Sequence, residues 1–130
     1  MNHYHSEILE IKKKIYSNQG QLDTVIALRK CIDNNYHQNL NLDLLSQKQF
    51  VSKFHLLRVF KRYYGQTPQQ YLREVRIQRS KVHLAQGMGV RDTCYAVGFT
   101  SLGSFSSLFK KRTGLTPRDF QKRNFKEIDH

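Results

Sequence analysis

The sequence predicts an all-α fold in which two small helical units are joined by one long helix. A segment of about twenty residues occurs twice, at Ser52 to Tyr71 and 49 residues later at Ser101 to Phe120. Each copy reads as a capping serine, an apolar helix face, a glycine and a Thr-Pro pair. Such repetition is typical of tandem helical units. No segment alternates with period two long enough to predict a strand.

Glycines, prolines and capping residues then set the order of the elements. Apolar residues from Tyr4 to Ile15 recur at helical spacing, and Asn18-Gln19-Gly20 ends that segment. A second amphipathic helix is predicted over residues 22–36, followed by a loop. Asn41 is a suitable N-cap for a short helix at 42–48, and residues 49–51 form a tight connection to the next helix.

The repeat supplies the remaining elements. Ser52 caps a helix to about Tyr63, with Tyr63 expected in the core, and a Thr-Pro start predicts a linker helix over 68–86. Residues 90–97 form a short helix, 98–100 a turn, and Ser101 caps a helix to about Arg112 before a last helix. We therefore predict an N-terminal extension (1–20), a first helix-turn-helix subdomain (21–66), a linker helix (67–87) and a second helix-turn-helix subdomain (88–130).

The charge of the chain is concentrated on the repeat. Between Leu44 and Arg118 there are fourteen basic residues, and the acids there are Glu74 and Asp92, so the whole net charge of +12 lies in this region. A solvated surface is the plain alternative. A basic domain between neutral flanks favours a polyanion as the binding partner. The paired helix-turn-helix pattern favours double-stranded DNA as that polyanion.

The linker helix also predicts how the DNA is bound. Nineteen residues, 68–86, span about 28 Å at 1.5 Å each, close to the repeat of about 34 Å between major grooves on one face of DNA. We therefore expect one chain to bind two adjacent grooves as a monomer.

Other classes of protein are disfavoured by composition. No apolar run is long enough to span a membrane and the N-terminus lacks a signal-peptide core, so we expect a cytoplasmic, nucleoid-associated protein. Cys31 and Cys94 lie in apolar helical patterns without motif spacing and are expected to be reduced. We expect no metal or cofactor. An enzyme is disfavoured because the basic region offers two carboxylates and no phosphate loop. An RNA-binding or protein-binding basic helical adaptor is the alternative.

The region from about Leu40 to Gln121 resembles the DNA-binding domain of AraC/XylS-type transcription regulators. The stretch G-F-T-S-L-G-S-F-S-S-L-F-K-K-R-T-G-L-T-P, from Gly98 to Pro117, is similar to the signature of that family. The resemblance implies a bacterial regulator with two helix-turn-helix motifs joined by a long helix, usually an activator that contacts RNA polymerase. The total length resembles the small single-domain members of the MarA type, because residues 1–39 are too few for an additional sensory domain.

The resemblance also implies which residues contact DNA. The base-reading positions of the first recognition helix correspond to Phe54, Leu57 and Arg58. Those of the second correspond to Leu102, Gly103, Ser104 and Ser107, a set without arginine or glutamine. The expected contacts to the DNA backbone are Ser52, Lys53, Lys61, Arg62, Ser101, Lys110, Lys111 and Arg112.

Each of these residues has a simpler alternative. Phe54 and Leu57 could pack on neighbouring helices, although exposed apolar groups also suit thymine methyls. Arg58 could be a solvated side chain, although no acid lies within four residues of it. Arg76, on the linker helix, is expected to be a structural or backbone-anchoring arginine.

Overall fold

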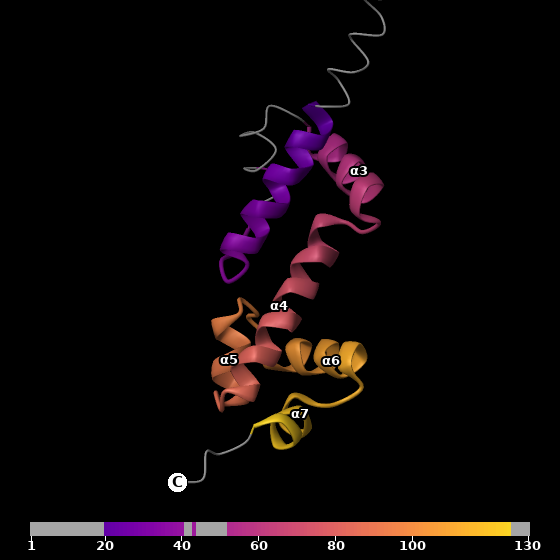
Figure 1. The fold of residues 1–130 in the computed structure, drawn as a ribbon. Helices are drawn as coiled ribbons and strands as arrows, with labels where there is room; N and C mark the ends of the chain where they lie inside the picture. Colours follow the sequence, from indigo (N-terminus) through magenta and orange to yellow (C-terminus); the bar gives the residue numbers. More distant parts are fainter. Residues whose placement is uncertain (1–19, 41–42, 44–51, 126–130) are drawn as a thin grey trace, which may run out of the picture. The chain divides into compact units, whose positions relative to one another are not determined.

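The computed structural model describes residues 20–40, 43 and 52–125, and every regular element in those ranges is an α-helix (Figure 1). Residues 20–35 are helical and are followed by α3 (Lys53–Tyr64), α4 (Pro68–Ala85), α5 (Val90–Ala96), α6 (Leu102–Thr113) and α7 (Pro117–Asn124). The predicted all-α fold is confirmed. The expected N-terminal helix, most of the short helix at 42–48 and the connection at 49–51 lie outside the described residues.

The chain divides into two compact units. The first holds the described residues of Met1–Cys31 and Asn41–Pro68, and the second holds those of Ile32–Leu40 and Gln69–His130. Residues 32–40 therefore belong with α4 to α7, although they lie far from them in the sequence.

The first unit buries one face of helix 20–35 and one face of α3. The fully or nearly buried side chains are Val25, Leu28, Leu56, Val59 and Phe60. On α3 these positions follow the spacing of three and four residues that places side chains on one side of a helix. The opposite side of α3 is left exposed.

Tyr63 was expected in this core, and that expectation is wrong. Its side chain is 40% exposed. The last turn of α3 packs through Tyr64 instead, whose ring centroid lies 4.7 Å from that of Phe60, four residues earlier. The Arg29 guanidinium lies over the same Tyr64 ring, 5.7 Å from its centroid. Because positions i and i+4 are neighbours on a helix surface, Tyr64 continues the Phe60 contact and Tyr63 turns outward.

The second unit is built around a cluster contributed by α4, α5 and α6. Its buried members are Ile77, Leu84, Cys94, Phe105 and Phe109. Partly buried apolar residues that pack against the cluster are Val90, Phe99, Leu108 and Phe120. The rings of Phe105 and Phe109 lie 5.7 Å apart between centroids, and Phe109 meets Phe120 of α7 edge to face at 5.3 Å. Aromatic packing therefore fixes the buried side of α6.

The ends of α3 and α6 are built alike, as the repeat predicts. The Ser52 hydroxyl accepts a hydrogen bond from the His55 amide, and the Ser101 hydroxyl accepts one from the Ser104 amide. Both helices end at a left-handed glycine, Gly65 and Gly114, whose amide donates to the carbonyl four residues earlier. The predicted starts and stops of α3 and α6 are confirmed.

Candidate nucleic-acid interface

The outer side of α3 presents the residues predicted to read bases in the first unit. Phe54 is 73% exposed, and Arg58 is also exposed, whereas Leu57 is half-buried. A large apolar ring with that exposure contributes little to the fold. Packing of Phe54 against a neighbouring helix, the simpler alternative for this residue, therefore does not explain its presence.

The outer side of α6 presents the corresponding set in the second unit. Leu102 is 37% exposed, and Gly103, Ser104 and Ser107 are all exposed. Most of the side chains on this surface are short and polar. It can offer hydroxyl groups, one apolar side chain and a stretch of uncovered backbone at Gly103, but no charged group for a base edge.

The basic residues expected to contact the DNA backbone fall into two groups. Lys61, Arg62, Lys110 and Lys111 are exposed and have no ion-pair partner among the described residues. Lys53 lies 3.7 Å from Asp43, and Arg112 lies 3.9 Å from Glu74. Exposed pairs of this kind contribute little to stability, so either cation can exchange its carboxylate for a phosphate.

The turn between α5 and α6 is where the second unit is most tightly constrained. Gly98 has a φ of +104°, and a Cβ there would lie 2.8 Å from the Tyr36 carbonyl oxygen and 2.9 Å from Nε of Arg76. A side chain at this position would be strained by the backbone angle and would also clash. The turn therefore requires glycine because two other segments approach it closely.

Arg76 of α4 is the group that approaches the turn. Its Nε donates to the Tyr36 carbonyl at 2.7 Å, its Nη2 donates to the Gln38 carbonyl at 2.9 Å, and its guanidinium lies 5.7 Å from the Phe99 ring centroid. The expectation of a structural, backbone-anchoring arginine is confirmed. Burial lowers the pKa of Arg76 from its usual value, and the two carbonyls supply acceptors for its fixed fork of donors.

Further contacts hold residues 32–40 against α4 within the second unit. The Tyr71 hydroxyl donates to Asp33 at 2.6 Å, and the Arg79 guanidinium lies 5.5 Å from the Tyr36 ring centroid. Sequence reasoning missed this role for residues 32–40. The two acceptors of Arg76 are main-chain carbonyls, which leave no trace in a residue pattern, and the partners of Asp33 and Tyr36 lie far away in the sequence.

Other chemistry is not indicated in the described part of the chain. Cys31 and Cys94 are not joined by a disulfide, as predicted, and burial raises the pKa of Cys94, which favours its protonated form. Within residues 20–40, 43 and 52–125 no group of three His, Cys, Asp or Glu residues is placed to hold a metal ion. None of the helices in the same ranges is long and apolar enough to cross a membrane.

The second unit thus contains a helix-turn-helix, α5 and α6, whose second helix carries an exposed polar side in a strongly basic chain. That combination defines a nucleic-acid-binding class of protein. A family model described as a helix-turn-helix domain matches residues 45–123. The chain belongs to the AraC/XylS-type family of helix-turn-helix transcription regulators.

Two curated relatives illustrate the match. An uncharacterized HTH-type transcriptional regulator in the cgkA 5′ region of Pseudoalteromonas carrageenovora is 38% identical over 91 residues, which cover 70% of this chain and 54% of that protein. The regulatory protein SoxS of Salmonella typhimurium is 31% identical over 108 residues, which cover 82% of this chain and 98% of SoxS. The chain spans about half the length, or less, of the first relatives it matches.

Two solved structures share the fold. The C-terminal domain of AraT, a response regulator from Geobacillus stearothermophilus, superposes with a TM-score of 0.76 at 23% identity, covering 82% of this chain and 92% of that one. The DNA-binding domain of the global transcriptional factor AdpA, in complex with a target DNA, superposes with a TM-score of 0.70 at 18% identity, covering 76% of this chain and 90% of that one.

Proposed function

We propose that the chain regulates transcription by binding double-stranded DNA in a sequence-specific way, with α3 and α6 as its two recognition helices. The observation that carries the proposal is the repeated outer surface. Two helices with the same caps each expose a set of side chains that the core does not use, and both lie in the region that holds the whole excess charge. Phosphates would then position the protein and the two exposed sets would read the sequence.

Each recognition helix would use its outer side for bases and its flanks for phosphates. In the first, Phe54, Leu57 and Arg58 read bases. In the second, Leu102, Gly103, Ser104 and Ser107 do so. The contacts to the DNA backbone come from Ser52, Lys53, Lys61, Arg62, Ser101, Lys110, Lys111 and Arg112.

The linker helix supports binding in two successive major grooves. The 18 residues of α4 span about 27 Å at 1.5 Å per residue, and successive major grooves on one face lie about 34 Å apart. We propose that the first helix-turn-helix subdomain (21–66), whose residues 32–40 pack with the second unit, and the second subdomain (88–130), joined by the linker (67–87), bind one chain to one site. A monomer would then protect an asymmetric site of about 20 base pairs, two turns of DNA.

The family supports a bacterial regulator that acts in the nucleoid. We propose an activator that contacts RNA polymerase, because that is the usual mode in AraC/XylS-type proteins. The relatives carry the names of regulators, including a transcriptional activator from Bacillus subtilis that is also named as a DNA repair enzyme. We assign no enzymatic role to this chain.

One experiment tests both the ligand and the mode of binding. Sites would be selected from random duplexes, and the affinity of the selected site would be compared with that of single-stranded RNA and of a scrambled duplex in one mobility-shift series. We expect an asymmetric consensus bound by one chain, with duplex DNA preferred over RNA. A palindromic consensus bound by two chains would contradict the monomer, and a preference for RNA would contradict the DNA-reading function.

A further inference from the structure

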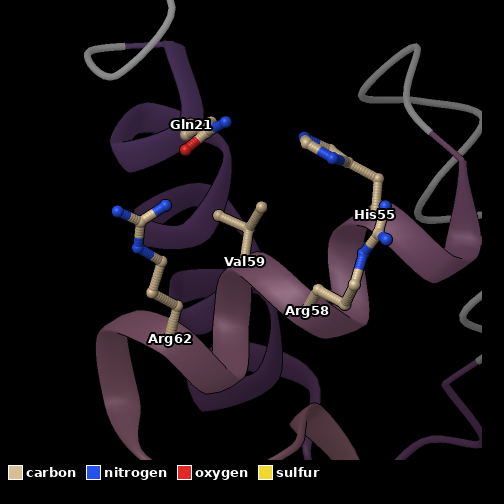
Figure 2. Close-up of a pocket in the computed structure, with 5 residues that line it drawn as sticks. All are labelled: Gln21, His55, Arg58, Val59 and Arg62. Atoms are coloured by element: carbon tan, nitrogen blue, oxygen red, sulfur yellow. The ribbon is translucent and has the colours of Figure 1, made fainter.

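A small notch lies on the first unit between helix 20–35 and α3. It is lined by Gln21 from the former and by His55, Arg58, Val59 and Arg62 from the latter, and it encloses about 240 Å³. Residues 55, 58, 59 and 62 are spaced by three and four, so they share one side of α3. Figure 2 shows Val59 as the floor, with Arg62 on one side, His55 and Arg58 on the other, and Gln21 above.

The notch contains an acceptor without a partner in the described part of the chain. Oε1 of Gln21 is buried and receives no hydrogen bond from any described residue. None of the five lining residues is acidic, and in the described parts of the chain neither Arg58 nor Arg62 forms an ion pair. A buried acceptor without a partner is costly. The oxygen and nitrogen of a glutamine amide have nearly the same shape, so a rotation by about 180° would put the NH₂ group in the place of Oε1 and turn it into a donor for an anion.

The chemistry of the lining favours an oxyanion. Two guanidinium groups supply positive charge, and the Gln21 amide and the His55 ring N–H can also donate hydrogen bonds. The volume is below the range of about 300 to 1,000 Å³ typical of sites for drug-sized ligands. A phosphate group therefore suits the notch better than a larger effector.

We propose that the notch holds one backbone phosphate of the DNA beside the first recognition helix. Arg62 contributes the charge, Gln21 and His55 donate further hydrogen bonds, and Arg58 remains available for a base edge. The inference rests on the proposed function, because it takes α3 to enter the groove. It adds Gln21, which lies outside the matched helix-turn-helix region, and His55 to the residues that contact DNA.

Duplexes in which single phosphates are replaced by uncharged methylphosphonates test the inference. With the full wild-type chain and its selected site, we expect one phosphate in the first half-site whose neutralisation weakens binding about tenfold, as expected for a hydrogen bond to a charged group. For Gln21→Leu and Arg62→Ala, binding to the normal duplex should itself be weaker, and neutralising that phosphate should have little further effect. Gln86→Leu and Arg91→Ala, exposed positions of the second unit, are matched controls that should retain the full tenfold response.

Thermal unfolding of the free protein separates this role from a structural one. Gln21→Leu removes a buried amide oxygen that has no partner among the described residues, so the variant should melt at or above the wild-type temperature while it binds DNA less well. Loss of stability in Gln21→Leu, or an unchanged phosphate response in both variants, would overturn the inference. So would saturation by inorganic phosphate that leaves DNA affinity unchanged, because the notch would then be a site for a free anion. Loss of all duplex specificity in the wild type would instead refute the proposed function.

Discussion

The two recognition helices are alike where they are buried or capped and unlike where they face outward. Both have 12 residues, a serine N-cap and a left-handed glycine after the last turn. Aligned by the repeat, Phe54 stands opposite Gly103, and Arg58 stands opposite Ser107. The shared positions hold the helix in place, and the outward positions are free to differ because no packing depends on them. Under the proposed function, the two halves of the DNA site would be read by different chemistry.

The largest expected effect tests what the two helices share, their basic last turns. If six to ten of the basic residues neutralise phosphates, affinity should fall by about 10³ to 10⁵ between 50 and 200 mM salt. Lys61→Ala and Lys110→Ala occupy equivalent positions, and each should reduce the salt slope by about one without changing the preferred sequence. Titrations over a range of salt concentrations would measure both slopes. If only one substitution changes the slope, the two units do not contribute equally to the phosphate contacts.

Specificity should be unequal between the halves of the site. Arg58 can donate two hydrogen bonds to a guanine, which is worth about 1 to 3 kcal/mol of discrimination, whereas a serine hydroxyl at 107 is less selective. Arg58→Ala should therefore relax base preference in one half only, and Ser107→Arg should sharpen the other half. Selection of sites with each variant would give the information content by position. If the wild-type protein selects a site with higher information content in the half bound by α6, then DNA shape or close backbone approach contributes more to specificity than the side chains of α3 do.

Replacing the glycine that ends each helix should destabilise the protein equally in the two units. A Cβ at Gly65 or Gly114 meets nothing within 4 Å, so the cost of alanine comes from the φ of +72° or +82° alone. A left-handed conformation costs roughly 1 to 2 kcal/mol for a residue with a side chain. Calorimetry of Gly65→Ala and Gly114→Ala should give similar losses. A much larger loss at one of them would reveal a constraint that the caps do not share.

The smallest effect concerns Gly103, whose glycine the fold does not require. A Cβ there would have Ser101 Oγ, at 4.0 Å, as its nearest neighbour. Alanine in place of helical glycine stabilises by roughly 0.5 to 1 kcal/mol, so Gly103→Ala should raise the melting temperature slightly. We expect it also to weaken DNA binding, because α6 would no longer approach the DNA as closely. Stabilisation with unchanged affinity would remove Gly103 from the reading surface.

Most of the fold followed from local signals, and the failures came where the outcome depended on distant residues. Serine caps, glycine stops and Thr-Pro starts are local, so the helices from Ser52 onward were predicted closely. Tyr63 was misplaced because Tyr64, and not Tyr63, packs on Phe60 and lies beneath Arg29 of helix 20–35, a contact that forms only through tertiary packing. The outward residues of both recognition helices were found through family resemblance together with helical spacing. The notch was not found, because Gln21 and His55 become neighbours only through tertiary packing.

The hydrogen bonds from Arg76 to the Tyr36 and Gln38 carbonyls determine which fragments of this protein can fold. A fragment that begins at α4 would retain α5, α6 and α7 but lose both carbonyls that receive the guanidinium. The guanidinium would then face Gly98 and Phe99 without acceptors, and the turn into α6 would lose its support. Because Arg76 and Tyr36 are 40 residues apart along the chain, residues 32–40 are synthesised first and can be held in place only after Arg76 of α4 has been made. A working fragment of the second unit should therefore include residues 32–40 in their natural position before α4.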